Sequence, residues 1–542
     1  METSVVKVIL KNLINIGKLI KSDRVSEGNF ENDRLNGKGK MTCNAGNSYE
    51  GDLKNGAFHG EGKYSFSEDE YVVGSFVNGQ IHGKVHYTYA NGNNFDGNFE
   101  NGKKEGQGVL CYANGDKYEG NFKDNIKSGY GAWTDSRGNI LKGDWANDQL
   151  DGEIDVTYAS GSNYVGGWKQ GQKHGKGCYT DMNGQSFDGD YVEGKKHGEG
   201  TLKTGEGACY IGDFVNDMRD GEGTMEFGSG RKYIGSWKKD VRCGEGIYYE
   251  TQEFDEPLYS GQWENDAYHG HGTYNFGGNE KFEGQFEIGM IQGEGKYTYQ
   301  NGDFYHGPWK NNKKEGLGKM TYADGSVYEG QYAEGLKKGL GCFSSANGTS
   351  MEGDWNGDSL EGHVNIVYSS GNKYMGDFFK GKLNGQGVFT SKNGDVYEGN
   401  FVDGLKEGLG KFKKEGGFEY NGHWKGNFFS GEGNMTMANG DNYVGNFENG
   451  TFEGEGTYSH LDGNCYTGNW KAGIKKGQGT YTFNNEDKYT GDYEDNSMHG
   501  YGKYVSKNWE YEGEYSMDHQ QGHGVLIMHK SGLTYTGTFA KD

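Results

Sequence analysis

The chain repeats itself every 23 residues. A glycine with an aromatic residue two positions before it and another two positions after it, as in Tyr164–Trp168 (YVGGW), recurs from Gly28 to Gly537. Nearly every step between these key glycines is 23 residues; one step of 26 carries an insertion near Pro257, and a step of 22 near the end is followed by one of 24. A fixed period of this length is typical of a repeat protein, in which each unit packs on its neighbours.

The positions around the key glycine are strict. Two residues after it, 22 of 23 repeats have an aromatic residue, with Leu53 as the exception, and two residues before it 19 of 23 do. Nine residues after it all 22 available positions are glycine, and eleven after it 19 of 22 are, with Val85, Ile154 and Val364 as exceptions. The glycines are therefore a repeat framework and not one phosphate-binding loop. No GK[ST] sequence occurs, which excludes a P-loop.

Each repeat has the pattern of a β-hairpin. In YVGGW the aromatic residues alternate with period two, so both rings point to one face of a strand and the glycine leaves room for a ring to lie on the backbone. A second alternating run follows, and turn signals such as Asn91-Gly92 and Asp324-Gly325 separate the runs. Two strands per repeat give about 10 Å per repeat. The sequence predicts an all-β fold, an elongated single-layer antiparallel β-hairpin solenoid on the order of 200 Å long.

The composition agrees with a thin core made of rings. Apolar residues make up 32% of the chain, a low fraction that is typical of disorder, but aromatic residues reach 14%, which disordered chains lack. A formal charge of −23 disfavours broad electrostatic binding to nucleic acid or anionic lipid. The seven cysteines form no CxxC pair and share no spacing. They indicate neither a zinc site nor a disulfide framework, and they agree with a reducing compartment.

The pattern Y-x-G-x-W-x-x-G-x-x-H-G-x-G resembles the MORN repeat family. The residues that match it are Tyr164, Gly166, Trp168, Gly171, His174, Gly175 and Gly177. The resemblance covers roughly residues 24–541, in about 22 successive repeats. It implies a protein scaffold; some family members attach to membranes or are proposed to bind phosphoinositides, and others belong to ciliary axonemes, the cytoskeleton or the cell cortex. Family enzymes carry an additional catalytic domain for which this chain has no room, so no enzyme activity and no cofactor are expected.

A histidine recurs eight residues after the key glycine, for example at His59, His174 and His269. Other repeats have a glutamate there, such as Glu105, which favours a turn residue over a catalytic one. Successive histidines would lie about 10 Å apart, too far to share one zinc ion. No metal site is predicted.

The position seven residues after the key glycine is basic in six of seven successive repeats. These candidate partner-binding residues are Lys104, Lys127, Lys173, Lys196, Arg219 and Arg242. Because the position repeats, its residues should line one edge of the sheet. One interpretation is solvated turn lysines and local packing. The sharper hypothesis is a basic track that binds an acidic protein surface, and a phosphoinositide membrane is the other candidate partner.

The first 23 residues differ from the repeats at 24–542. Apolar residues fall on one face of a helical pattern, and lysines such as Lys7 and Lys11 lie on the others. The apolar residues are Val6, Ile9, Leu10, Leu13, Ile16 and Ile20. This pattern predicts a short amphipathic α-helix that caps the first repeat, docks on a partner or lies on a membrane. The sequence stops halfway through a repeat, which leaves a strand edge for self-association.

These features predict a non-enzymatic scaffold or spacer in a large assembly, without nucleic acid. The family resemblance suggests a cytoplasmic location on the cytoskeleton, with a cilium or flagellum axoneme (radial spoke or central apparatus) first. The alternatives are a membrane-cortex tether that binds phosphoinositides and a regulatory subunit of an enzyme on another chain.

Overall fold

The computed structural model describes residues 7–10, 16–251 and 256–540, with the backbone alone for 7–10 and 16. The described residues form β-strands and turns and no helix. The chain divides into two units, Met1–Gly272 and Thr273–Asp542. Each unit is an antiparallel sheet, as the repeat pattern predicts.

The strands of the first unit are β1 (Lys7–Leu10), β2 (Ile16–Ile20), β3 (Arg24–Glu31), β4 (Arg34–Cys43), β5 (Ser48–Lys54), β6 (Ala57–Ser65), β7 (Tyr71–Val77), β8 (Gln80–Thr88), β9 (Asn94–Glu100), β10 (Lys103–Cys111), β11 (Lys117–Lys123), β12 (Ile126–Thr134), β13 (Ile140–Ala146), β14 (Gln149–Thr157), β15 (Asn163–Lys169), β16 (Gln172–Thr180), β17 (Ser186–Val192), β18 (Lys195–Lys203), β19 (Cys209–Val215), β20 (Met218–Glu226), β21 (Lys232–Lys238), β22 (Val241–Tyr249) and β23 (Tyr259–Glu264). Strand β24 (Ala267–Gly277) contains the division between the units.

The strands of the second unit are β25 (Glu280–Glu287), β26 (Met290–Thr298), β27 (Phe304–Lys310), β28 (Lys313–Lys314), β29 (Gly316–Thr321), β30 (Val327–Ala333), β31 (Leu336–Ser344), β32 (Ser350–Asn356), β33 (Ser359–Val367), β34 (Lys373–Phe379), β35 (Lys382–Thr390), β36 (Val396–Val402), β37 (Leu405–Lys413), β38 (Glu419–Lys425), β39 (Phe428–Thr436), β40 (Asn442–Glu448), β41 (Thr451–Ser459), β42 (Cys465–Lys471), β43 (Ile474–Thr482), β44 (Lys488–Glu494), β45 (Ser497–Val505), β46 (Trp509–Ser516), β47 (His519–Met528) and β48 (Leu533–Phe539).

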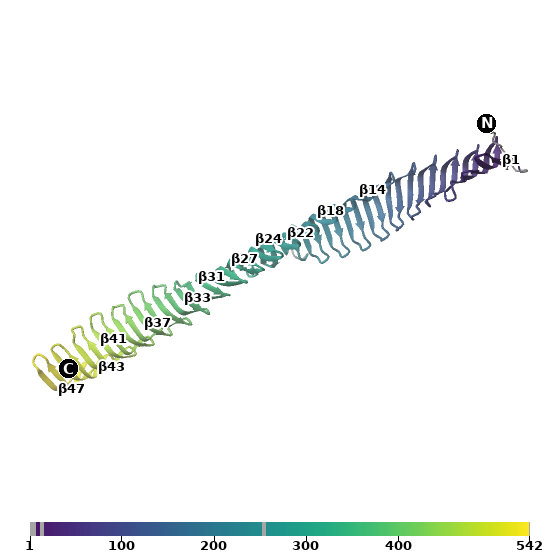
Figure 1. Cartoon of the computed structure of the whole chain (residues 1–542). Helices are drawn as coiled ribbons and strands as arrows, with labels where there is room; N and C mark the ends of the chain where they lie inside the picture. Colours follow the sequence, from purple (N-terminus) through teal and green to yellow (C-terminus); the bar gives the residue numbers. More distant parts are fainter. Residues whose placement is uncertain (1–6, 11–15, 252–255, 541–542) are drawn as a thin grey trace. The chain divides into compact units, whose positions relative to one another are not determined.

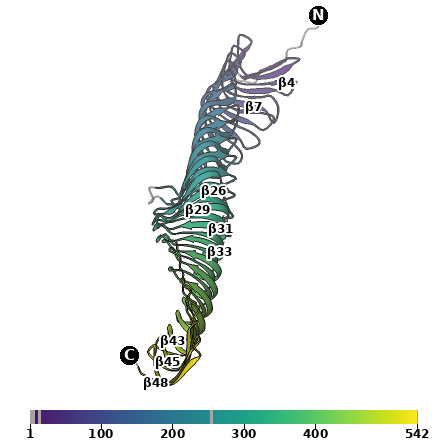
Figure 2. The ribbon, with the colours of Figure 1, turned by 90° about the vertical axis from the view of Figure 1, so that its left-hand side faces the viewer.

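Each unit is a single layer. From β1 to β23, and again in the second unit, each strand pairs with its neighbour in sequence, and β28 and β29 share β27 as their partner. In Figure 1 and Figure 2 the strands of each unit stand side by side in one row with turns along both margins, and no described element covers either face. Burial alternates along the strands; in β5, for example, Tyr49, Gly51 and Leu53 are buried. One face, which we call the aromatic face, therefore holds the core.

The glycines lie in register across the strands. Gly166 pairs with Gly177 inside one hairpin, and Gly177 pairs with Gly189 of the next repeat. The ring of Tyr164 lies over this row, because a Cβ atom on Gly177 would come within 2.4 Å of the tyrosine Oη. Tyr164 itself is fully buried. The glycines are needed because the ring occupies the space that side chains would fill.

A β-bulge follows each key glycine and explains why the ring is so often tyrosine. The register of β15 and β16 shifts between Gly166 and Trp168. The hydroxyl of Tyr164 donates a hydrogen bond of 2.7 Å to the carbonyl oxygen of Gly167, the bulge residue. The same bond joins Tyr397 to Asn400 at 2.9 Å. The tyrosine ring that covers the glycines thus also supplies a hydrogen-bond donor to a carbonyl oxygen that the bulge leaves without a partner in the neighbouring strand.

The three exceptions to the glycine rule are compensated. They occur in the repeats whose residue two before the key glycine is aliphatic and not aromatic. The pairs are Val72 with Val85, Leu141 with Ile154, and Met351 with Val364. In each pair the second residue lies opposite the key glycine, so the two side chains are diagonal neighbours on one face. Val85, Ile154 and Val364 are all buried. A β-branched side chain on one strand replaces the tyrosine ring that the partner strand lacks.

Hydrogen bonds between repeats secure both margins. At one margin a turn residue reaches the preceding repeat: Asp148 Oδ1 accepts a bond of 2.9 Å from the amide of Lys127. The backbone of this turn residue also bonds the preceding repeat, and where the residue is glycine this bond remains, as in the 2.9 Å bond from the Gly194 amide to the Lys173 carbonyl. At the other margin Asp116 Oδ1 accepts from the amide of Ser136 at 2.8 Å. Neighbouring repeats are therefore fixed at both ends of each strand.

The predicted N-terminal helix over 1–23 is wrong where the structure describes that segment. Strands β1 and β2 pair with each other, and β2 continues the sheet beside β3, with Gly17 opposite Gly28. The apolar residues include β-branched Val8 and Ile9, which favour strands, and a glycine at 17 is unfavourable inside a helix. Pairing with β2 also satisfies backbone groups of β3 that would otherwise face solvent.

Candidate functional site: aromatic cages and the opposite face

The six predicted basic residues point into the aromatic face. Lys173 lies opposite Trp168 in the hairpin of β15 and β16, between the bulge and the turn of the hairpin. Its Nζ lies 4.7 Å from the centre of the Tyr164 ring, 4.1 Å from Tyr179 and 5.3 Å from Tyr191. These are cation–π distances. Lys173 is half-buried among the rings.

The rings around this position come from fixed places in the repeat. They are two residues before the key glycine, thirteen after it, and two after the next key glycine; we call them an aromatic cage. For Lys127 the cage is Tyr118, Trp133 and Trp145, at 5.4, 4.4 and 4.9 Å from Nζ. The cations found over such rings are Lys104, Lys127, Lys173, Lys196, Arg219, Arg242, Lys314, Lys337, Lys406 and Lys475.

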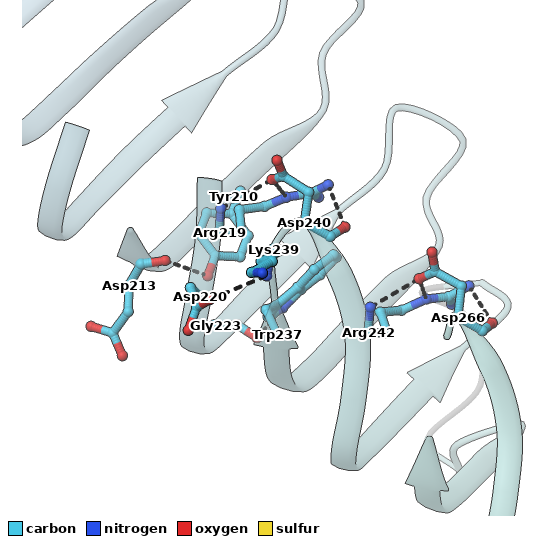
Figure 3. A network of polar contacts seen from close by, with 10 residues as sticks. All are labelled: Tyr210, Asp213, Arg219, Asp220, Gly223, Trp237, Lys239, Asp240, Arg242 and Asp266. Carbon is cyan, nitrogen blue, oxygen red and sulfur yellow. Dashed lines mark hydrogen bonds and ion pairs between the residues drawn. The ribbon is translucent and has the colours of Figure 1, made fainter. Parts of the chain in front are cut away.

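The two arginine cages also contain a carboxylate (Figure 3). Asp240 Oδ1 accepts hydrogen bonds from the amide and from Nε of Arg219, at 3.0 and 2.9 Å, and its backbone carbonyl accepts from Nη2 at 3.1 Å. The guanidinium lies 4.1 Å from the centre of the Trp237 ring. Arg242 repeats this arrangement with Asp266 and Trp263. Each arginine therefore joins its own repeat to the next one.

Burial among rings changes the acidity of the caged lysines. It lowers the pKa of Lys173 to about 8, because the rings replace water that would solvate the charge; nearby Lys196 lowers it further and Asp217 opposes the shift. Burial also lowers the pKa of Lys104 and of Lys127, for which Asp148 opposes the shift. Lys173 has glycine and not aspartate in the turn of the next repeat, so no carboxylate caps its amide.

The structure places all six residues at the same position of their repeats, each half-buried in its own aromatic cage. They contact rings and turn residues of their own and the next repeat, so they contribute to packing between repeats. Where the position is apolar, its side chain fills the same space; Phe58 stacks on Tyr49 with ring centres 4.1 Å apart, and Leu150 is buried. Their role in binding a partner stays a prediction.

The structure places the predicted N-terminal residues in strands. Ile9 and Leu10 lie in β1, and Ile16 and Ile20 lie in β2. Val6 and Leu13 are outside the described residues. They are thus not brought together as one helical face.

The other face of the sheet also has a distinct character, which the strict repeat positions do not reveal. In the second unit, exposed apolar side chains project from it at Leu317, Leu340, Met375 and Leu409, with 68%, 65%, 53% and 64% of their surface exposed. Strand register places them away from the rings; Leu340 pairs with Asp354, one residue from the buried Trp355. We call these four residues the apolar row. The signal was available, since the residues before the key glycine and ten after it alternate with the strict positions.

A sequence model described as the MORN repeat matches twenty segments of the chain. They are residues 27–48, 49–69, 73–94, 95–117, 118–140, 164–186, 187–208, 210–230, 233–250, 259–279, 282–304, 305–327, 328–350, 374–396, 397–417, 420–442, 443–465, 466–488, 489–510 and 511–529. The chain belongs to the MORN-repeat family. Two repeats fall between matched segments, at 141–163 and 351–373, and they contain Ile154 and Val364.

MORN repeats are in general scaffold repeats that bind proteins or lipids, and proteins made of them are typically structural. No helix of the described residues is long and apolar enough to cross a membrane. In the same residues, no three histidine, cysteine or acidic side chains lie close enough together to hold a metal ion.

Solved structures give only distant similarities. The TCP domain of SAS-4 (dCPAP) from Drosophila melanogaster, in complex with a proline-rich motif of Ana2 (dSTIL), has 10% identity over 33% of this chain and 90% of that chain, with a TM-score of 0.20. The TCP10 domain of CPAP from Danio rerio has 10% identity over 39% and 89%, with a TM-score of 0.17. These scores are too low to support an argument. No curated protein matches the sequence.

Proposed function

We propose that this protein is a non-enzymatic scaffold or spacer in a large protein assembly. The observation that supports the proposal most is that the two faces of the sheet differ: one holds the packed core and the other exposes apolar side chains. Rings, glycines and caged cations of the aromatic face contact one another within and between repeats, whereas the apolar row lies on the opposite face with its side chains exposed. Exposed apolar residues on a sheet that needs no further packing are available to partner proteins.

The assembly that we propose is a ciliary or flagellar axoneme, with a radial spoke or the central apparatus first, and otherwise another part of the cytoskeleton. The protein would then be cytoplasmic. The support is the family. MORN repeats cover most of residues 27–529 of this chain, and family members made of such repeats occur in these structures. We also propose self-association through β48, whose Leu533 and Tyr535 are exposed.

The test is affinity purification from the native cell with surface variants. Leu340→Lys with Leu409→Lys removes two of the four residues of the apolar row without touching a ring. Ile211→Lys is the matched control on the face of the first unit opposite its rings, where the side chain is also exposed. We expect the intact protein and the control to recover axonemal or cytoskeletal proteins and the double variant to lose them.

Recovery of those proteins by the double variant would remove the apolar row as their binding surface. Recovery of membranes or lipid vesicles in place of cytoskeletal proteins would support a membrane-cortex tether. Recovery of an enzyme whose activity this chain alters would support a regulatory subunit.

A further inference from the structure

One aromatic cage is built like the arginine cages but lacks the cation. In the repeat of Gly491 the basic position holds Met498, and the cage rings are Tyr489, Tyr504 and Tyr515. Tyr489 and Tyr515 pack edge to face, with ring centres 5.0 Å apart. Tyr118 and Trp145 of the Lys127 cage pack in the same way, also with ring centres 5.0 Å apart.

The carboxylate that completes an arginine cage is also present. Asp518 Oδ1 accepts a hydrogen bond of 2.8 Å from the amide of Met498, as Asp240 Oδ1 does from the amide of Arg219 at 3.0 Å. In the Arg219 cage the same oxygen also accepts from the guanidinium. Asp518 forms no ion pair with any described residue. Its carboxylate thus lies beside the position at which other repeats place a cation.

Space for a cation adjoins these groups. A cavity of about 430 Å³ is lined by Met498, Tyr504, Trp509, Tyr515, Asp518, His519, Gln520 and Ala540. Trp509 stacks on Tyr504, with ring centres 4.8 Å apart and planes 15° apart. The hydroxyl of Tyr515 is buried and forms no hydrogen bond of ordinary geometry with a described residue, although Gln520 lies beside it.

We propose that this cavity beside the Met498 cage, which we call the open cage, binds an arginine side chain of a partner protein. A guanidinium is planar, stacks on aromatic rings and donates several hydrogen bonds to a carboxylate in a fixed geometry. The cavity offers the stacked pair Tyr504 and Trp509 for its faces and Asp518 for its N–H groups. Arg219 with Asp240 and Trp237 shows how this chain binds the same group internally.

The inference rests on the scaffold function and names the chemistry of one of its contacts. The expected ligand is a cation because a fixed carboxylate and the faces of aromatic rings both attract positive charge and repel phosphate or carboxylate groups. Arginine is preferred over lysine because the turn aspartate hydrogen-bonds each caged arginine at 2.9 Å, whereas Nζ of the caged Lys337 lies 3.5 Å from its turn aspartate, Asp358.

The test is a titration of the full-length protein, labelled with ¹³C at the methionine methyl groups, with a short peptide that presents one arginine. The same peptide with citrulline is the neutral control of nearly equal shape. We expect the Met498 methyl signal to shift saturably with the arginine peptide, and the citrulline peptide to bind at least about tenfold more weakly, because a charge-assisted hydrogen bond is lost.

Two variants separate the site from its surroundings. Asp518→Asn keeps the backbone cap, since Asn496 Oδ1 accepts from the amide of Lys475 in the equivalent place, but it removes the charge and should abolish the shift. Met498→Arg should fill the cage from within and abolish peptide binding, read from the Trp509 indole N–H signal. Asp240→Asn, in an occupied cage, is the matched control and should bind the peptide normally.

Equal shifts with arginine and citrulline, or unchanged binding by Asp518→Asn, would overturn the proposal. So would peptide binding that persists in Met498→Arg. None of these results changes the outcome of the affinity purification with the apolar-row variants. A wrong ligand for the open cage can therefore be distinguished from a wrong scaffold function.

Discussion

Two adjacent repeats of the first unit solve the same packing problem in different ways. In the repeat of Gly166 the ring of Tyr164 covers Gly177, and Lys173 lies in the cage. In the repeat of Gly143 the equivalent residues are Leu141, Ile154 and Leu150. Both arrangements fill the face, since Tyr164, Ile154 and Leu150 are all buried.

The comparison shows that the residue eleven positions after the key glycine depends on the residue two positions before it. A glycine is required eleven residues after the key glycine only where a ring lies across it. Where the ring is replaced by leucine, a β-branched residue takes its space, and the caged cation is replaced by an aliphatic side chain. The repeat framework therefore has an aromatic, cation-bearing form and an aliphatic form. Each form can be tested by replacing one of its residues with the equivalent residue of the other form.

The largest effect is expected from Ile154→Gly. The substitution leaves a cavity beside Leu141 and a flexible residue in the middle of β14, which together should destabilise this repeat by about 4 kcal/mol. Because a repeat array need not unfold in one step, the effect should be read from the hydrogen exchange of amides in β13 and β14. Adding Leu141→Tyr restores the aromatic form and should recover most of the loss.

The reverse change, Gly177→Val, should cost about 3 kcal/mol through overpacking. A Cβ atom at this position meets Oη, Cε2 and Cζ of Tyr164 at 2.4 to 2.7 Å. Exchange of the β15 and β16 amides should accelerate, and Tyr164→Leu should suppress the effect in the double variant. Equal losses in the single and double variants would show that the two positions are not coupled.

A smaller effect is expected when the tyrosine ring is kept and only its hydroxyl is removed. Tyr164→Phe leaves the carbonyl oxygen of Gly167 without its 2.7 Å partner and should cost about 1 kcal/mol. Phe187, which occupies this position in the next repeat, shows that the ring alone is compatible with the fold. Phe187→Tyr is the matched reverse test and should stabilise its repeat by no more than that amount, measured by the same exchange experiment.

The cationic form should also make the stability of its repeat depend on pH. The pKa of Lys173 is lowered by burial to about 8 in the folded chain, below its ordinary value. The unfolded chain therefore binds the proton more tightly, and stability should rise with pH from about 8 to about 10.4, where the unfolded lysine loses its charge. Lys173→Met should raise the apparent melting temperature at pH 7, and the difference from the intact protein should shrink toward pH 10.

The sequence predicted the repeat, the hairpin and the single layer because alternation and glycine spacing are local signals. It could not predict that Tyr164 reaches the bulge carbonyl of Gly167, because the bulge is a feature of strand pairing. The basic position was singled out from the sequence as a partner-binding site, which stays a prediction. The direction of its side chain depends on the same bulge, which turns Lys173 toward the rings. The N-terminal pattern was misassigned because its apolar spacing suits a helix, whereas pairing with β3 favours a strand.

The claim that partners bind the face opposite the rings is tested most directly by hydroxyl-radical footprinting of the protein, free and in its native assembly. This method reports the reactivity of individual side chains. The account predicts that Leu317, Leu340, Met375 and Leu409 are reactive in the free protein and protected in the assembly. The caged positions of the first unit, such as Lys127 and Trp133, should change little. Protection confined to those cages, with the apolar row as reactive as in the free protein, would contradict the claim that partners bind the face opposite the rings.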